Sequence, residues 1–250
     1  MDRIKKALCF TFAGTIFLFS LMLSSCSDEK RNYPTKGVDV SSWQKEVDFP
    51  QLKKEGFTFV MLRIGTTNGK DDKFEKYYRE AKHAGLDIGC YFYTYATDVL
   101  TAEKDAQNII KYLRNKKMQY PVYIDVEDDL LLKLSKSERM EICERYRQTL
   151  EEENYLVGIY SNSNWYEHYL DFKKLRENYE IWTANWSDSE KADADMSSFC
   201  RVWQYTSTGK TKAIDGKVDM NISYFDYPTY VKENGYNNYP KQKTTENVSS

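Results

Sequence analysis

Two acidic residues, Asp125 and Glu127, stand two positions apart in the stretch YPVYIDVEDD and alternate with Val122, Ile124 and Val126. Side chains at positions i and i+2 of a β-strand leave the same face. If this stretch is a strand, both carboxyl groups share one face and the branched apolar groups share the other. The acidic face either meets solvent or holds the two acids together for chemistry.

Carboxyl groups held close together in a buried site suit the cleavage of glycosidic bonds. Burial and mutual repulsion raise the pKa of one group, which can then donate a proton while an ionised neighbour stabilises positive charge. A glycosidase needs both, because the leaving oxygen takes a proton and the sugar becomes oxocarbenium-like. Clustered carboxylates also bind Mg²⁺ or Ca²⁺, so the residue types favour a glycosidase without excluding a metal site.

Short apolar runs alternate with amphipathic helical patterns along most of the chain. Five strand–helix alternations predict parallel β/α units, whereas the spacers between the last three strands are too short or too polar for full helices. We therefore expect a single α/β domain, a TIM-like barrel whose last part lacks helices. The expected strands are 37–41, 57–65, 87–96, 120–127, 155–161, 180–186, 200–206 and 218–225, and the expected helices are 71–85, 101–117, 135–154 and 161–178.

Residues typical of helix ends accompany three of these helical patterns. Thr101, followed by acids, is the expected N-cap of the second helix. Ser135 with Glu138 three residues later predicts a capping box. Gly85 suits a left-handed end of the first helix.

In a β/α barrel the chemistry collects where the strands end and the loops begin. Asp39 ends the first expected strand, Asp125 and Glu127 end the fourth, and Asp219 lies in the eighth. We therefore expect these four acids to point into the barrel mouth, while the apolar side of the fourth strand packs outward against helices.

Composition limits the classes of partner. The 250 residues are 41% hydrophobic, enough for a substantial core, and the net charge is −2 with no basic stripe, which argues against nucleic acid. Beyond the N-terminal segment the cysteines are Cys90, Cys143 and Cys200, whose spacing fits no metal site. They are expected to be small buried hydrophobes, although two of them can form a disulfide in an oxidising compartment. We expect no metal, no cofactor and a monomer.

The N-terminus resembles a targeting segment. A basic start precedes an apolar run over residues 7–23, the layout of a secretory signal, with a short membrane anchor as the alternative. The sequence LSSC at 23–26 resembles a bacterial lipoprotein box, which implies cleavage before Cys26, its lipidation and a bilayer-anchored location in the cell envelope. The expected parts are a signal peptide (1–25), a lipidated cysteine with a polar linker (26–36), the barrel (37–227) and a polar, disordered tail (228–250).

Five segments together resemble one enzyme family. They are GVDVSSWQKEVDF (37–49), DDKFEKYYREAKHAGLDIGCYFY (71–93), YPVYIDVED (120–128), IWTANW (181–186) and VWQYTSTGK with IDGKVDMN (202–221). In this order they resemble the glycoside hydrolase family 25 lysozymes, also called Chalaropsis-type or phage-type muramidases. The match runs from about residue 36 to 226.

The resemblance implies a (β/α)5(β)3 barrel that hydrolyses the β-1,4 bond from N-acetylmuramic acid to N-acetylglucosamine in peptidoglycan. It makes Glu127 the general acid and Asp125 the residue that stabilises the reacting centre, and it adds Asp39 and Asp219 to the catalytic set. Two routes stay open, retention through the substrate's own acetamido group or inversion by water. We favour the first, with Asp125 bracing the acetamido group.

The same resemblance points to residues that bind the sugar, because aromatic rings stack on the apolar faces of pyranoses. For each aromatic residue, plain packing in the core is the alternative, and Arg63 either holds an acid in the mouth or forms a structural pair. The substrate-binding candidates are Tyr91, Tyr93, Trp182, Trp186, Gln204, Tyr205 and Arg63.

Two departures from the family pattern concern positions near the expected mouth. Phe92 stands where the family often has a histidine, but strand alternation turns it outward, toward packing rather than catalysis. The loop TTNG (66–69) lacks the acid of the family's usual loop, which removes one expected substrate contact.

Two other functions remain open. One is a glycan-binding surface lipoprotein without turnover, although binding alone does not require Glu127. The other is a glycosidase for another N-acetylated glycan such as chitin. Such enzymes typically carry a longer acidic strand motif, and Pro121 and Tyr123 stand at its outer acidic positions here.

Overall fold

The computed structural model describes residues 32–186 and 195–241, which all belong to one compact unit. The signal segment, Cys26 and the end of the expected tail lie outside the described residues. No helix within the described ranges is both long and apolar enough to span a bilayer.

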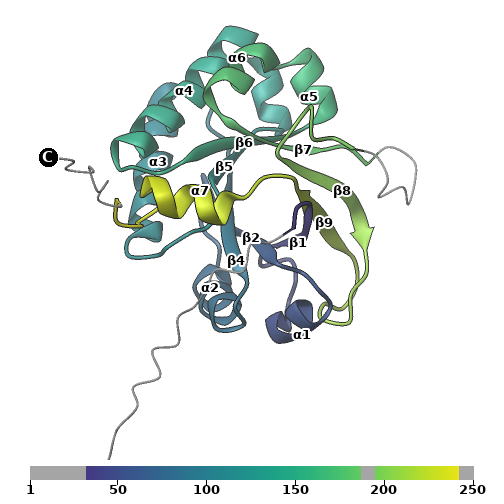
Figure 1. The fold of residues 1–250 in the computed structure, drawn as a ribbon. Coiled ribbons are helices and arrows are strands. Elements are labelled where there is room, and N and C mark those ends of the chain that lie inside the picture. The colour runs from purple at the N-terminus through teal and green to yellow at the C-terminus, as the bar shows by residue number, and fades with distance from the viewer. Residues whose placement is uncertain (1–31, 187–194, 242–250) are drawn as a thin grey trace, which may run out of the picture. The chain divides into compact units, whose positions relative to one another are not determined.

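The described strands form a closed barrel (Figure 1). Around it the order is β1-β9-β8-β7-β6-β5-β4-β2, and pairing of β1 with β2 closes the ring. β9 runs antiparallel to both of its neighbours, and the other pairs in the ring are parallel. The strands are β1 (Thr35–Val40), β2 (Phe59–Thr66), β4 (Asp87–Tyr93), β5 (Val122–Asp125), β6 (Val157–Asn162), β7 (Glu180–Ala184), β8 (Val202–Gly209) and β9 (Val218–Ser223), with the short β3 (Gly69–Lys70) forming a hairpin with β2.

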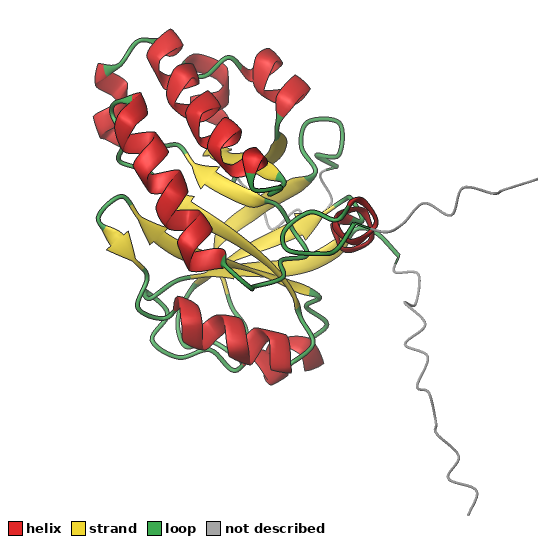
Figure 2. Ribbon diagram, turned by 90° about the vertical axis from the view of Figure 1, so that its left-hand side faces the viewer, coloured by secondary structure: helices red, strands yellow, loops and turns green. Residues whose placement is uncertain are grey.

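Helices follow each of the first five barrel strands and pack outside the sheet (Figure 2). No α-helix separates β7, β8 and β9 in the described part of the chain, so the (β/α)5(β)3 architecture is confirmed. The helices are α1 (Phe49–Lys54), α2 (Phe74–His83), α3 (Val99–Leu113), α4 (Lys136–Glu152), α5 (Ser163–His168), α6 (Phe172–Asn178) and α7 (Tyr227–Asn234), with a 3₁₀ turn, η1 (Asp129–Lys133), before α4.

Strand alternation divides the core into two layers. Val122 and Ile124 of β5 pack outward in the layer between barrel and helices, as does Phe92 of β4. Tyr123 points inward and packs with Trp182 in the layer that fills the barrel. The expected orientation of β5 is therefore confirmed, and Asp125 at its end lies on the inner face, as does Glu127 two residues later.

Local capping chemistry fixes the helix ends. The capping box of Ser135 and Glu138 is present, and Gly85 follows α2 with a left-handed φ of 72°. Thr101 is not the cap of α3. Asp98 takes that place, because its carboxylate accepts hydrogen bonds from the backbone N–H and the hydroxyl of Thr101.

The helix expected over 161–178 is two helices. α5 begins after Asn162 and α6 begins after Asp171, whose side chains accept from the backbone N–H groups of Trp165 and Lys174. An internal N-cap satisfies the free backbone donors of a new first turn, so it divides an otherwise continuous helical pattern.

The expectation of a disordered tail over 228–250 is wrong for the part that is described. α7 lies across the N-terminal end of the barrel strands (Figure 1), with Tyr227 and Val231 buried. Beyond it the buried Asn237 donates to the carbonyl of Tyr120 and accepts from the N–H of Leu156. These contacts order a polar segment because it satisfies backbone groups that face the barrel floor.

The cysteines are packed as small apolar groups. Cys90, Cys143 and Cys200 are buried free thiols, so packing is confirmed and the alternative disulfide is not formed. Burial raises the pKa of the Cys90 and Cys200 thiols, the latter to about 12.

Candidate active site

A cavity of about 280 Å³ opens at the C-terminal ends of the barrel strands. Its walls come from all eight barrel strands and from segments that adjoin them, as expected for a β/α barrel. The lining residues are Asp39, Val40, Ser41, Trp43, Gln44, Arg63, Tyr91, Tyr93, Asp125, Glu127, Tyr160, Trp182, Trp186, Gln204 and Asp219.

The four acids singled out from the sequence all line this cavity. Asp39 stands directly opposite Asp219 in the antiparallel pairing of β1 with β9. Asp125 is the last residue of β5, and Glu127 follows it by two positions. Strand register and the closure of the barrel therefore bring together residues that are up to 180 positions apart in the chain.

Asp39 is buried and hydrogen-bonded on several sides. Its Oδ2 accepts from Nε2 of Gln204 at 2.9 Å and from Nδ2 of Asn221 at 2.8 Å. It also shares a hydrogen bond with Asp219. Burial and the neighbouring Asp219 raise the pKa of Asp39 well above its ordinary value, although the two amide donors oppose the shift.

Asp125 is buried but incompletely satisfied. Its Oδ1 has no hydrogen-bond partner among the described residues. Burial, followed by the charges of Glu127 and Asp39, raises the pKa of Asp125, and Arg63 opposes this. A buried oxygen without a donor is costly, so this one is suited to accept a hydrogen bond from a bound ligand.

Glu127 is partly exposed to the cavity. Its Oε2 accepts from Nδ2 of Asn162 at 3.0 Å. Burial raises the pKa of Glu127, and the nearby Asp219 adds to this, whereas the hydrogen bond from Asn162 lowers it. The raised pKa favours a protonated carboxyl that a ligand can reach, which is what a general acid requires.

Aromatic side chains form the floor and rim of the cavity. Trp182 is buried, and its indole N–H donates to Asn221 Oδ1 at 2.8 Å. Trp186 at the rim is 54% exposed, and its indole N–H donates to Gln204 Oε1 at 3.0 Å. Tyr91 and Tyr93 complete the wall formed by β4.

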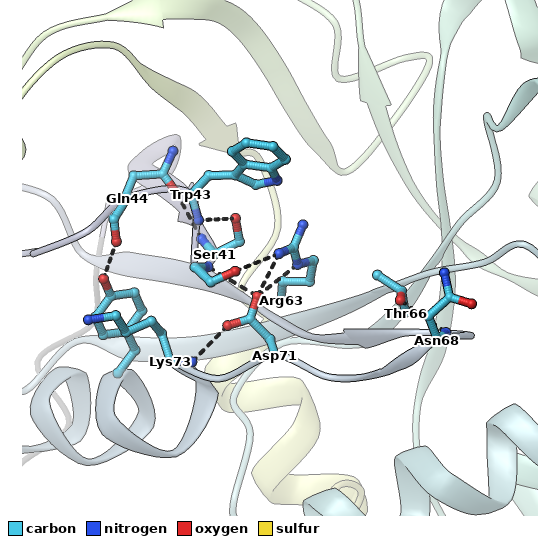
Figure 3. Close-up of polar contacts among 10 residues, drawn as sticks. Ser41, Trp43, Gln44, Arg63, Thr66, Asn68, Asp71 and Lys73 are labelled. Atoms are coloured by element: carbon cyan, nitrogen blue, oxygen red, sulfur yellow. Dashed lines mark hydrogen bonds and ion pairs between the residues drawn. The ribbon is translucent and has the colours of Figure 1, made fainter.

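Arg63 lines the cavity, but its ion-pair partner is Asp71, which does not line the cavity, so the alternative of a structural pair holds. It contacts Asp71 Oδ2 through Nε at 2.8 Å and through Nη2 at 2.7 Å, and Nη2 also donates to Ser42 Oγ (Figure 3). Asp71 further accepts from the backbone N–H groups of Ser42 and Lys73. The acid that Arg63 holds is thus Asp71, which anchors the loop after β1.

Tyr205 is not brought to the cavity, contrary to the sequence prediction. Its hydroxyl donates to the sulfur of Met220 at 3.2 Å, and its ring packs against Trp203 in the outer layer. Gln204 points inward from β8, so its two neighbours in the strand point outward. The other substrate-binding candidates line the cavity.

Five site residues were missed from the sequence. Asn221 was signalled by its position two residues after Asp219, on the same strand face. Tyr160 and Asn162 have the same spacing at the end of β6, while Trp43 and Gln44 lie in the expected first motif. The missed residues are Trp43, Gln44, Tyr160, Asn162 and Asn221.

Within the described ranges no group of three or more His, Cys, Asp or Glu side chains is arranged to hold a metal ion.

Comparisons with known proteins show which proteins this chain resembles. The chain is 25% identical over 199 residues to lysozyme M1 of Streptomyces globisporus, covering 74% of this chain and 66% of that protein. It is 27% identical over 190 residues to the autolytic lysozyme of Clostridium acetobutylicum, covering 74% and 55%. The modular autolysin LytC of Streptococcus pneumoniae, solved with a synthetic peptidoglycan ligand, has the same fold with a TM-score of 0.68 and 23% identity, covering 77% and 47%.

The chain spans about half to two thirds of the length of these relatives. The family model of the glycosyl hydrolases family 25 matches residues 38–214, a range that holds most of the barrel and three of its four clustered acids. This match covers well over half of the chain, and the chain therefore belongs to glycosyl hydrolases family 25.

Proposed function

We propose that this chain is a peptidoglycan hydrolase, a lysozyme that cuts the β-1,4 bond between N-acetylmuramic acid and N-acetylglucosamine. The observation that carries the proposal is the pairing in one cavity of Glu127, a partly exposed acid with a raised pKa, and Asp125, a buried acid with a free oxygen. The lysozyme relatives and the peptidoglycan ligand of the pneumococcal autolysin support the substrate class.

Glu127 is the proton donor in the first step of the proposed reaction. Its proton passes to the glycosidic oxygen, and the bond from that oxygen to C1 of the muramyl sugar breaks. The acetamido oxygen of the same sugar forms the new bond to C1, so the intermediate is a cyclic oxazolinium ion. Asp125 Oδ1 accepts the hydrogen bond of the acetamido N–H and stabilises the positive charge that develops there.

The second step reverses these roles. Glu127, now ionised, takes a proton from a water molecule, and the resulting hydroxyl group bonds to C1 as the oxazolinium ring opens. One water molecule is consumed for each bond cut, and the acetamido group and Glu127 return to their initial states. Two displacements at C1 retain its configuration.

The aromatic rim is placed to hold the sugar chain. Trp43 is 81% exposed, its indole directed away from the Arg63–Asp71 pair, and Trp186 is 54% exposed (Figure 3). Both lie in the cavity wall, where an exposed ring can stack on a pyranose face. The same rim would serve a glycan-binding protein without turnover, but such a protein has no use for a pair of acids whose pKa values are both raised.

Product analysis of purified peptidoglycan digests tests the proposal. The full chain is incubated with peptidoglycan between pH 4 and 8, and the released fragments are reduced and identified by mass spectrometry, with Glu127→Gln as the control. Fragments that end in reduced muramic acid support the proposal. Fragments that end in reduced glucosamine would show that the enzyme cuts the other glycosidic bond. Glycan binding without fragments supports the non-catalytic alternative, and comparable cleavage of chitin points to a different glycosidase.

A further inference from the structure

Two side-chain amides beneath the cavity have orientations fixed by indole groups. The Trp186 indole N–H and the Tyr160 hydroxyl both donate to Gln204 Oε1 at 3.0 Å, and the Trp182 indole N–H donates to Asn221 Oδ1 at 2.8 Å. An indole N–H can only donate. Each amide must therefore turn its oxygen toward a tryptophan and its NH₂ group toward Asp39.

Both NH₂ groups converge on one atom, Asp39 Oδ2, at 2.9 and 2.8 Å. An oxygen that accepts two N–H donors cannot itself carry a proton that points at either of them. Any proton held by Asp39 must then be on Oδ1, the oxygen left for the hydrogen bond with Asp219. Two carboxyl groups in such contact do not both ionise readily, so they share one proton.

We propose that Asp39 is the neutral member of this pair and a positioning residue, held by Gln204 and Asn221 so that its Oδ1–H donates to Asp219, the ionised carboxylate of the cavity. The assignment follows from burial as well as geometry. Asp39 is 4% exposed, whereas Asp219 is partly exposed to the cavity, where water or substrate can solvate its charge. The proposal rests on the proposed function only where activity is its readout.

The surroundings of the pair agree with a single negative charge on Asp219. Burial raises the pKa of both groups, as expected for two carboxyl groups that share one proton. Ionised Asp219 also contributes to the raised pKa of Glu127. The other titratable or charged side chains that face the pair are Arg63 on β2, Tyr91 on β4, Asp125 and Glu127 at the end of β5, and Tyr160 on β6.

Substitutions of Asp39 and Asp219 test whether Asp39 acts as a neutral hydrogen-bond donor or as an ionised carboxylate. Asparagine can replace a neutral Asp39, because its oxygen can accept both amides while its NH₂ donates to Asp219. Asp39→Asn should keep kcat/KM within about tenfold of the wild type, whereas Asp39→Leu and Asp219→Asn should each lose about a hundredfold or more. Equal losses in Asp39→Asn and Asp219→Asn would overturn the assignment.

Removal of the amide donors provides an independent test through the pH profile. In Gln204→Met or Asn221→Leu, Asp39 is less firmly held, so Asp219 loses part of its hydrogen bond and binds its proton more tightly. The acid limb of the kcat/KM profile should move up by about one pH unit. Gln148→Met, which alters an exposed amide on α4, should leave both limbs in place. A lower profile with unmoved limbs in the two site variants would mean a merely structural role.

Carbon-13 NMR of labelled aspartate carboxyl groups in the full chain tests the proposal without any measurement of enzyme activity. The Asp219 signal, assigned with Asp219→Asn, should titrate first as the pH rises, while the Asp39 signal stays at its protonated position until Asp219 has ionised. Ionisation of Asp39 before Asp219 would refute the proposal. If no variant or wild type cleaves peptidoglycan, the proposed function fails, and this titration still decides which carboxyl group holds the proton.

Discussion

Glu127 and Asp125 differ in their surroundings although only one residue separates them. Glu127 is open to the cavity and has one donor, Asn162, whereas the Oδ1 of Asp125 is buried without a donor among the described residues. The carboxyl group of Glu127 can exchange a proton with a ligand, whereas the buried Oδ1 of Asp125 is suited to accept a hydrogen bond from that ligand. The two roles that we propose for these acids rest on this difference in position.

Glu127→Gln removes the transferable proton but keeps the size and polarity of the side chain. We expect hydrolysis of peptidoglycan to fall by about 10²- to 10⁴-fold, the usual contribution of a general acid. Release of reducing ends measures the activity, and circular dichroism checks the fold. Near-wild-type activity in this variant would show that another group donates the proton.

Asp125→Asn should make the protein more stable at neutral pH while it abolishes turnover. Because burial raises the pKa of Asp125 in the folded state, the folded chain binds more protons than the unfolded chain between the ordinary aspartate pKa and the raised one. Stability therefore falls as pH rises through this interval, and an uncharged amide avoids the loss.

Thermal unfolding at two pH values measures this effect. Each kcal/mol gained corresponds to a rise in Tm of about 2–4 °C for a domain of this size. The rise should be present at pH 7 and disappear below the ordinary aspartate pKa of about 3.9. Asp129→Asn, at an exposed position in η1, should show no such difference. A gain in Asp125→Asn that is equal at both pH values would contradict the explanation.

At the scale of elements, the two-residue period of the strands carried most of the predictive power. It placed Asp125 and Glu127 inside the barrel and Val122 and Ile124 outside, and the structure agrees. The same rule applied to β8 gives Gln204 inward and Tyr205 outward. The prediction for Tyr205 is wrong because it rests on the aromatic residue type, whereas the strand alternation decides which face the side chain takes.

Other features depend on contacts between distant elements, and no local pattern contains them. The Arg63–Asp71 pair joins β2 to the segment before α2, and the hydrogen bond from Asn162 to Glu127 joins β6 to the end of β5. Residues 227–241 likewise have a defined structure because they contact the floor of the barrel, and their own composition does not predict it. A polar segment is predicted to be disordered whenever its partners are unknown.

Asn237→Gly tests whether this C-terminal segment is part of the domain. Asn237 has a positive φ of 53°, so glycine keeps the backbone conformation while it removes the bonds to Tyr120 and Leu156. The unpaired backbone groups should cost about 2–4 kcal/mol in the free energy of unfolding, measured in urea. Asn115→Gly, at an exposed position with a φ of 64°, is the matched control. Equal, small effects would mean that the segment contributes no stability.

At the scale of the whole molecule, the barrel separates two ends with different tasks. The C-terminal ends of the strands carry the cavity, and the opposite end is closed by α7 and the residues after it. Tyr33, just before β1, donates to Asp226 Oδ1 at 2.9 Å, so the start and the end of the barrel chain meet at the closed end.

We propose that Cys26 anchors the protein to a bilayer of the cell envelope. In bacterial cells, Cys26→Ala should abolish labelling by a radioactive fatty acid and move the chain from the detergent phase to the aqueous phase of a Triton X-114 extraction. Cys9→Ala alters a cysteine within the apolar run and should change neither result. Fatty-acid labelling that persists in Cys26→Ala would place the lipid elsewhere.

The meeting of both chain ends at the closed end has a geometric consequence for an anchored enzyme. Nine peptide units separate Cys26 from Thr35, where β1 begins, and even fully extended they reach about 30 Å. A lipid on Cys26 would therefore be attached through this short segment to the closed end of the barrel, which is the end opposite the cavity. If the proposed anchor is present, the cleavage of peptidoglycan would be confined to glycan strands within reach of this segment from the lipid surface.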